Sequence, residues 1–246
     1  MAKVRLDVLL VEKGLQESRQ KAQATIMSGL VFVNGQRVDK PGTGVAADAA
    51  IEVRGAALRY VSRGGLKLEK AMATWPIDLN GCVCMDIGAS TGGFTDCLIQ
   101  HGAKKVYAID SGSSQLHASL LNDPRVTSME NCNMRYFDRN AIAETCDLAV
   151  CDVSFISQTL LHGKIASLLK DGGYFITLIK PQFEVGKNGI GKGGIVKSDE
   201  LRKGACERVI ESCRVFHLSL VSLIDSPIEG GDGNHEYLAL FRYHNR

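Results

Sequence analysis

The sequence lacks any long apolar run. No stretch of its 246 residues approaches the roughly 20 consecutive apolar residues that a helix needs to cross a bilayer. Its first residues, MAKVRLDVLLVEKGL, also lack the apolar centre and the small-residue cleavage site of a signal peptide. We therefore expect no membrane segment and no export, and we expect the protein to stay in the cytoplasm.

The spacing patterns of zinc sites are also missing. No Cys-x-x-Cys pair occurs, and no two of the six histidines lie three to five residues apart. The eight cysteines are scattered, and Cys82, Cys84 and Cys151 lie inside apolar, strand-like runs. We therefore expect reduced core cysteines instead of disulfides, and no metal site.

The net charge of +2 says little about partners, but its distribution is uneven. Residues 1–60 hold nine Lys and Arg against six Asp and Glu, whereas the remaining residues hold 20 against 21. The positive excess is therefore N-terminal. It is a weak indication that this segment meets a polyanion.

The N-terminal segment is predicted to form a small α+β unit. Apolar residues recur at helical spacing over residues 6–10 before Gly14, and Ser18 can cap a second helix that ends near Gly29. The Asn-Gly dipeptide that follows suits a two-residue turn in a hairpin over residues 30–38. A further strand, over residues 50–53, completes the unit.

Two cations, Arg19 and Lys21, lie in the first turn of the second predicted helix. The helix dipole and unpaired amides already make this end positive, so the cations favour a bound anion such as a phosphate. A solvated helix face is the alternative. The pattern RLDVLLVEKGLQESRQKAQATIMSGLVFVNGQRVDKPG as a whole resembles the S4 RNA-binding domain. This resemblance implies RNA binding, with Arg5, Arg19, Lys21, Arg37, Arg59 and Arg63 as the candidate contacts.

Residues 54–66 mix basic residues with glycines and are predicted to be a linker, followed by a helix over 67–75. From Gly81 onward, strand-like and helix-like segments alternate, which is typical of a parallel, doubly wound α/β sheet. The predicted strands cover 82–87, 105–110, 126–129, 147–153, 174–180, 216–225 and 236–242, and the helices cover 91–101, 158–169 and 198–213. The last two strands are expected to form a hairpin at one edge of the sheet.

The segment MDIGASTGGFTD joins the first of these strands to a glycine-rich turn and a helix, where α/β sheets bind ligands. Asp86 ends the strand and suits a cationic amino group, whereas it would repel a pyrophosphate. Asp110 ends the next strand, where ribose hydroxyls are commonly bound. The set favours S-adenosylmethionine over a dinucleotide. The predicted cofactor residues are Asp86, Gly88, Ala89, Ser90, Thr91, Gly92, Gly93, Phe94, Asp110, Asn133, Met134 and Asp152.

Four polar residues stand where the sheet would place apolar residues or caps: Lys67, Asp152, Lys180 and Glu236. Asp152 and Lys180 end the fourth and fifth predicted strands, so they should meet at the carboxyl edge. The four positions resemble the Lys-Asp-Lys-Glu catalytic tetrad of FtsJ-like ribose 2'-O-methyltransferases. Together with the S4-like start, the resemblance extends over almost the entire chain to the TlyA (hemolysin A-like) family.

This resemblance implies a Rossmann-like class I methyltransferase domain over residues 61–246, after an S4-like domain over 1–60. Its α/β sheet would have seven mostly parallel strands with an antiparallel edge strand. The implied reaction is S-adenosylmethionine-dependent methylation of a cytidine 2'-hydroxyl in 16S or 23S ribosomal RNA, with ribosomal RNA or ribosomal subunits as partner. Lys180 would act as a base or only position the hydroxyl. A non-catalytic ribosome assembly factor and a hemolysin-like protein are the alternatives, and the oligomeric state stays open.

A glycine-rich, basic loop over residues 182–197 follows the predicted strand that ends at Lys180. We expect either a mobile segment that closes over RNA or an ordinary surface loop. Its GKNGIGKG run is similar to a phosphate-binding P-loop, but Gly193 replaces the Ser or Thr that binds magnesium, and no helix follows directly. A nucleotide triphosphatase is therefore disfavoured.

Overall fold

The computed structural model describes residues 3–54, 59–186, 189–230 and 233–245, and the chain divides into two compact units, 1–63 and 64–246. The predicted linker, 54–66, spans this division, and its residues 55–58 lie outside the described part. Its last residues are not a linker, because helix α3 (Gly64–Thr74) begins there. Glycine does not prevent a helix from starting, so the two glycines of Arg-Gly-Gly-Leu gave the wrong boundary.

The smaller unit has the predicted two helices and a hairpin. Ser18 caps the second helix by accepting a hydrogen bond from the Lys21 N–H at 3.2 Å. Asn34 and Gly35 both adopt positive φ, as a two-residue hairpin turn with strand-matching twist requires. The elements are α1 (Leu6–Glu12) and α2 (Arg19–Met27), the pair β1 (Lys3–Arg5) and β4 (Gly44–Ala46), and the three-stranded sheet of β3 (Gln36–Arg37), β2 (Val31–Val33) and β5 (Ile51–Val53).

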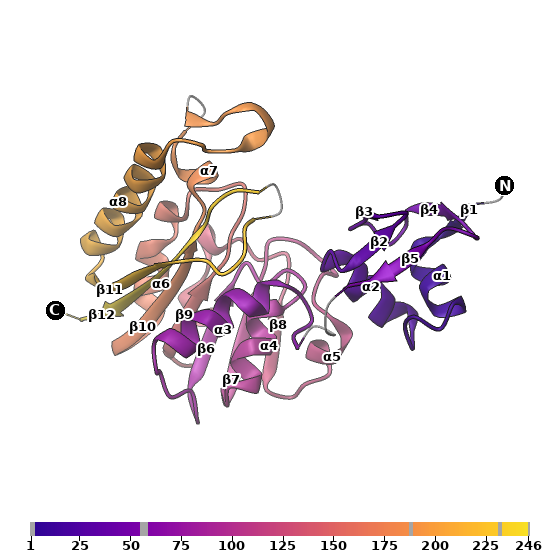
Figure 1. Ribbon diagram of the computed structural model, residues 1–246. Coiled ribbons are helices and arrows are strands. Elements are labelled where there is room, and N and C mark those ends of the chain that lie inside the picture. Colours follow the sequence, from indigo (N-terminus) through magenta and orange to yellow (C-terminus); the bar gives the residue numbers. More distant parts are fainter. Residues whose placement is uncertain (1–2, 55–58, 187–188, 231–232, 246) are drawn as a thin grey trace. The chain divides into compact units, whose positions relative to one another are not determined.

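The larger unit is built on a seven-stranded sheet in the order β11-β12-β10-β9-β6-β7-β8 (Figure 1). β12 runs opposite to the other six strands of this sheet, and it lies next to the edge strand β11, with which it forms the predicted hairpin. The α/β fold class is therefore confirmed. The strands are β6 (Val83–Ile87), β7 (Lys105–Ile109), β8 (Val126–Met129), β9 (Cys146–Cys151), β10 (Leu169–Ile179), β11 (Leu218–Asp225) and β12 (Tyr237–Tyr243).

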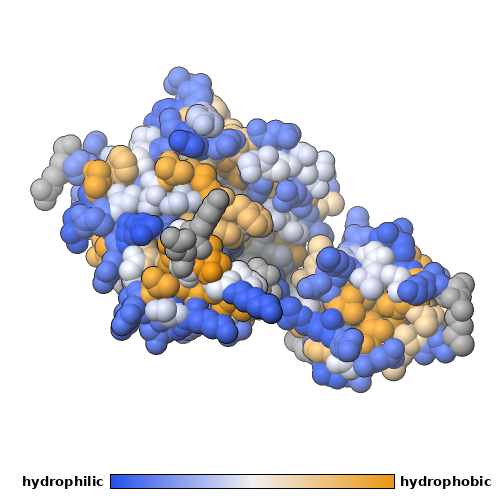
Figure 2. Space-filling view, turned by 90° about the horizontal axis from the view of Figure 1, so that it is seen from above, coloured by the Kyte–Doolittle hydropathy of each residue, from blue (hydrophilic) through white to orange (hydrophobic). Residues whose placement is uncertain are grey.

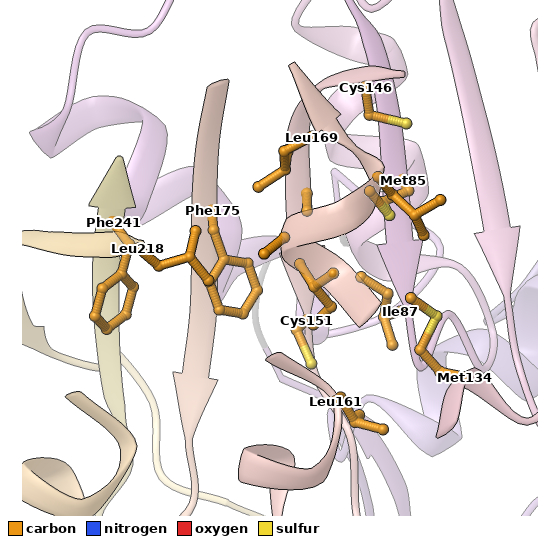
Figure 3. Close-up of a cluster of buried hydrophobic side chains, with 14 of the residues drawn as sticks. Met85, Ile87, Met134, Cys146, Cys151, Leu161, Leu169, Phe175, Leu218 and Phe241 are labelled. Atoms are coloured by element: carbon orange, nitrogen blue, oxygen red, sulfur yellow. The ribbon is translucent and has the colours of Figure 1, made fainter. Parts of the chain in front are cut away.

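Helices cover both faces of this sheet, with α3 and α4 on one side and α6 and α8 on the other (Figure 1). Under α6 and α8, the rings of Phe175 and Phe241 stack with centroids 5.8 Å apart, and Met85 and Ile87 extend the same core (Figure 3). From above, hydrophobic residues gather toward the middle of this unit, surrounded by hydrophilic ones (Figure 2). The helices are α4 (Gly93–Gln100), α5 (Ala118–Leu121), α6 (His162–Leu168), α7 (Pro181–Glu184) and α8 (Asp199–Val215).

Two predicted helices begin or divide differently in the structure. The helix after the glycine turn starts at Gly93, because Gly92 has a φ of +98°, which no right-handed helix accommodates. The predicted helix 158–169 is a 3-10 turn (Gln158–Leu160) followed by α6, and β10 begins at Leu169 instead of 174. Between Leu169 and Tyr174 the pairing of β10 with β9 shifts register, which hides the strand from a simple alternation pattern.

In the part of the chain that the structure describes, no helix is long and apolar enough to cross a membrane. All eight cysteines are free, and six of them are buried. In the same residues, no group of three or more His, Cys, Asp and Glu side chains is arranged to hold a metal ion.

Candidate active site

The glycine turn after β6 forms one wall of a cavity of about 580 Å³ at the carboxyl edge of the sheet. This volume lies in the range of small-molecule and cofactor sites. Six predicted cofactor residues line it: Gly88, Ser90, Asp110, Asn133, Met134 and Asp152. The other six lie outside the lining, and five of these are buried: Asp86, Ala89, Gly92, Gly93 and Phe94, with Thr91 half-buried.

Position 88, directly after β6, has to be glycine because it lies against the main chain that follows β9. A Cβ at this position would lie 2.5 Å from the main-chain oxygen of Asp152, and Gly88 has a φ of +83°. Both the space and the backbone conformation therefore exclude a side chain. This contact brings the glycine turn beside Asp152, so that one edge of the sheet carries both the cavity and the tetrad residue.

Asp110, at the end of β7, fastens two segments of the cavity wall together. Its Oδ2 accepts a hydrogen bond from the Ser90 N–H and its Oδ1 accepts one from the Gly112 N–H, both at 2.7 Å. A carboxylate has about four lone-pair sites, so each oxygen can accept a second bond from a ribose hydroxyl. Asp110 also lines the cavity, and its binding of a ribose stays a prediction.

Sequence reasoning missed the loop that follows Asp110 and the residue that shapes it. Glu130 accepts hydrogen bonds from three successive main-chain N–H groups, those of residues 114–116, at 2.7–3.3 Å. These bonds hold the pKa of Glu130 below its usual value. The loop contributes Ser111, Gly112 and Gln115 to the cavity lining. The signal available was only that residues after a parallel strand share its carboxyl edge.

Asp86 does not line the cavity, although the sequence suggested that it meets the amino group of the cofactor. Its side chain is fully buried and its Oδ2 accepts a hydrogen bond from the Thr95 hydroxyl of α4 at 2.7 Å. Among the described residues, its Oδ1 has no hydrogen-bond partner. Burial, with some repulsion from Asp152 and Asp110, raises the pKa of Asp86 to about 7. Through the Thr95 hydroxyl, Asp86 therefore links β6 to α4, and its contact with the cofactor stays a prediction.

The four tetrad candidates form two ion pairs. Lys67 Nζ lies 2.6 Å from Glu236 Oε2, and Lys180 Nζ lies 2.5 Å from Asp152 Oδ1. The four side chains are at most 20% exposed, so solvent screens these pairs weakly. Lys180 also donates a hydrogen bond to the Ser154 hydroxyl at 2.9 Å.

Strand register brings the two pairs to the same edge. Ile179 of β10 pairs with Tyr237 of β12, so Lys180 and Glu236, the next residues along, lie opposite one another where the two strands meet. Asp152 directly follows β9, which pairs in parallel with β10, and it also lines the cavity. Both ion pairs therefore lie at the carboxyl edge, and of the four residues Asp152 lines the cavity.

A second feature that sequence reasoning missed is Phe155, three residues after Asp152. Its side chain is 93% exposed and lines the cavity, and its φ of +65° is unusual for a bulky residue. Its ring lies 5.4 Å from that of Phe183, which follows β10. An aromatic residue directly after a strand end is the only sequence signal. A solvated aromatic ring at the mouth of a polar cavity provides a surface for stacking.

The predicted RNA contacts in the smaller unit have partners of their own. Arg5 and Arg19 each donate to the buried carboxylate of Asp7 at 3.0 Å, while Lys21 pairs with the exposed Glu17. These acidic residues supply the anions that the cations at the start of α2 seemed to need. Within the described part of the chain, Arg37 is exposed and has no ion-pair partner, Arg59 lies 5.5 Å from the Tyr60 ring centre, and Arg63 is half-buried.

The glycine-rich loop over residues 182–197 is tied down near both ends. It begins with α7, in which Glu184 is buried. Near its other end, the Val196 N–H donates to Asn234 Oδ1 and Asn234 Nδ2 donates to the Gly194 carbonyl, each at 3.0 Å. These contacts fix the two ends of the loop, so its closing over RNA stays a prediction. Residues 187–188 of the loop lie outside the described part.

The close approach at Gly88 predicts a stability difference between two Gly→Ala variants. Gly88→Ala should destabilise the larger unit by about 2–4 kcal/mol, because the new methyl group meets the Asp152 carbonyl at a positive φ. Gly204→Ala, in α8 with nothing near the added Cβ, should instead stabilise by about 0.5–1 kcal/mol. Urea denaturation of both variants measures the difference, and equal stabilities would refute the steric argument.

Asp86 predicts an unusual pH dependence. Because its folded pKa lies near 7 and its unfolded pKa near 4, the native state binds the extra proton between these values. The contribution of Asp86 to the free energy of unfolding therefore falls as pH rises from about 4 to 7. Asp86→Asn should remove this component, so that the variant gains stability over the wild type between pH 5 and pH 8. Denaturation at both pH values tests this, and parallel curves would contradict it.

The comparisons with known proteins agree with this geometry. The family model of FtsJ-like methyltransferases matches residues 60–243, and that of the S4 domain matches residues 4–51. Hemolysin A of Brachyspira hyodysenteriae is 44% identical over 97% of this chain and 99% of its own. The 16S/23S rRNA (cytidine-2'-O)-methyltransferase TlyA of Mycobacterium tuberculosis is 40% identical over 98% of this chain and 90% of its own.

Solved structures extend the comparison. A candidate hemolysin from Streptococcus thermophilus superposes with a TM-score of 0.79 and 44% identity, covering 100% of this chain and 90% of that one. Aeropyrum pernix fibrillarin with bound S-adenosyl-L-methionine shares only the fold, with a TM-score of 0.53 and 15% identity over 73% of this chain and 74% of that one. The chain therefore belongs to the FtsJ-like methyltransferases, a family that uses S-adenosylmethionine, and to its TlyA (hemolysin A-like) members with an N-terminal S4 domain.

Proposed function

We propose that the protein methylates the 2'-hydroxyl of a cytidine ribose in ribosomal RNA, in the cytoplasm, with the S4 domain docking the RNA. The observation that carries this proposal is the pair of lysine–carboxylate contacts, Lys67–Glu236 and Lys180–Asp152, of which the second reaches the cavity through Asp152. These are the four positions of the ribose-methylating tetrad. The name of the Mycobacterium tuberculosis relative supports cytidine and ribosomal RNA as the target.

The residues present suit the cofactor. The cavity has the size of a nucleoside site, Gly88 and Ser90 of the glycine turn line it, and Asp110, which also lines it, can accept bonds from ribose hydroxyls. Asn133 and Met134 lie on the same wall and can flank the adenine. S-adenosylmethionine, when bound, supplies a methyl group on a positively charged sulfur.

The tetrad can then prepare the RNA hydroxyl for attack. A ribose hydroxyl is a weak nucleophile at neutral pH, so it must be oriented in line and its proton must be removed. Lys180 lies against Asp152 of the cavity lining. As an ammonium it can hold the hydroxyl oxygen, and once it has given up its own proton it can receive that of the hydroxyl. Each lysine is matched by a carboxylate, so the cluster is close to neutral and does not repel the cationic methyl donor.

Phe155 supports an RNA substrate over a small molecule. Proteins that act on single nucleotides commonly stack an unpaired base on an aromatic ring. The 93% exposed ring lies at the cavity mouth, beside the tetrad, where the base of the target nucleotide would arrive. The S4 domain supports the same class of substrate.

Lys180→Ala should abolish methyl transfer to ribosomal RNA while S-adenosylmethionine binding stays close to wild type. The matched control is Lys170→Ala, because Lys170 also pairs with an aspartate, Asp147, at 2.7 Å. Lys170 lies near the start of β10, whereas Lys180 directly follows its end. The measurement is transfer of labelled methyl to ribosomal RNA, with calorimetry for cofactor binding. Near-wild-type turnover of Lys180→Ala would remove Lys180 from the mechanism. If the wild type binds the cofactor and RNA but transfers no methyl group, a non-catalytic assembly factor would be favoured.

RNA docking by the smaller unit predicts a change in salt dependence. Arg37→Ala should weaken RNA binding and lower the slope of log affinity against log salt by about one, because one phosphate contact is lost. Arg214→Ala, an exposed arginine of α8 paired with Glu211, is the control and should leave the slope unchanged. Filter binding over a series of salt concentrations measures both slopes. Identical slopes for the two variants would count against Arg37.

A further inference from the structure

The loop of residues 152–158 carries three groups of the site, namely Asp152, Ser154 and Phe155. It leaves the sheet at the end of β9 and is bonded at each end. At its start, the Asp152 N–H donates to the Ile87 carbonyl at 2.9 Å. Along its length, Asp152 and Ser154 contact Lys180, and the ring of Phe155 meets that of Phe183. Its far end determines whether these contacts persist.

Glu184 holds that far end. This residue lies four positions after Lys180, at the end of the one-turn helix α7, and is only 3% exposed. Its Oε2 accepts a hydrogen bond from the Ser157 hydroxyl at 2.6 Å and its Oε1 accepts one from the Gln158 N–H at 3.0 Å. Its own main-chain oxygen accepts a hydrogen bond from Arg208 of α8. The carboxylate therefore links the loop after β9 to the segment after β10.

Gln158 strengthens the same link from within the sheet. Its side-chain amide donates to the Leu178 carbonyl at 3.2 Å and accepts a hydrogen bond from the Thr177 hydroxyl at 2.5 Å. Both partners belong to β10, the strand that leads to Lys180. The loop with Asp152 and the strand with Lys180 are thus joined on both sides of their ion pair.

We propose that Glu184 is a positioning residue for methyl transfer: it holds the 152–158 loop so that Asp152 stays against Lys180 and Phe155 stays at the cavity mouth. This inference rests on the proposed function and deepens it, since Glu184 touches no substrate. The loop needs such a restraint, because Phe155 keeps a left-handed backbone that a bulky residue leaves when it is free to do so.

The chemistry of Glu184 argues against a role in packing alone. Burial raises the pKa of this carboxyl, which means that the fold works against its charged form. An apolar side chain of similar volume would serve stability at least as well as a buried carboxylate. An acceptor for two loop hydrogen bonds is needed only where the exact path of the loop matters.

The test compares Glu184→Ala with Glu184→Gln. Alanine removes both acceptors, and kcat should fall about 10²-fold because the reacting groups are no longer aligned. Glutamine can accept the Gln158 N–H with its oxygen and donate to the Ser157 hydroxyl with its nitrogen, so kcat should stay within about threefold of wild type. Glu211→Ala, which removes an exposed glutamate of α8, should leave kcat unchanged.

Hydrogen exchange provides a readout that does not depend on turnover. The Gln158 amide and those of residues 153–157 should exchange faster in Glu184→Ala than in the wild type, and at nearly the wild-type rate in Glu184→Gln. If the wild type transfers no methyl group to ribosomal RNA, the proposed function fails, whereas the exchange rates still show whether Glu184 holds the loop. Unchanged exchange in Glu184→Ala would overturn the inference in either case.

Two further outcomes would also overturn it. One is wild-type kcat in a folded Glu184→Ala variant, and the other is an equal loss of kcat in the alanine and glutamine variants. If Glu184→Ala does not fold, Ser157→Ala takes its place, because it removes one donor from the other side of the same contact. Its kcat should fall in the same direction by a smaller factor, with faster exchange at Gln158, and wild-type values of both would contradict the inference.

Discussion

The contact on which the site depends is the approach of Gly88 to the main chain of Asp152. It lets β6 and β9 lie side by side up to their carboxyl ends, with no side chain between them. The end of β6 then supplies one wall of the cavity, and the end of β9 supplies Asp152, which pairs with Lys180. The cavity and this ion pair can therefore be neighbours because the position carries no Cβ.

Around that contact, the site is held by hydrogen bonds that main-chain N–H groups donate to carboxylates. Asp110 fastens the glycine turn, Glu130 shapes the loop after β7, and Glu184 fixes the loop after β9. Each of these three carboxylates orders a loop that has no helix or strand pairing of its own at the contact. The loops of the carboxyl edge are consequently more constrained than their irregular backbone suggests.

The sequence predicted the sheet and its hairpin, because hydrophobic alternation is a local signal, but it did not predict that the tetrad divides into two ion pairs. It placed Lys180 and Asp152 at one edge because both residues end parallel strands. It missed Glu130, Phe155 and Glu184, since their roles depend on contacts between residues distant in sequence or, for Phe155, on an unusual backbone angle. It left open whether the cations at the start of α2 meet a bound anion or solvent, and it missed Asp7, twelve residues before Arg19, as a partner of Arg19 within the protein.

Two guanidinium groups of the smaller unit share one buried carboxylate, so Arg5, Arg19 and Asp7 together present a net charge of +1. Each arginine is more than half exposed and already held in place. If the smaller unit docks RNA as proposed, these arginines would lose less rotational freedom on contact. Fewer counterions would be displaced than the number of arginines implies, and recognition there would depend more on shape than on charge.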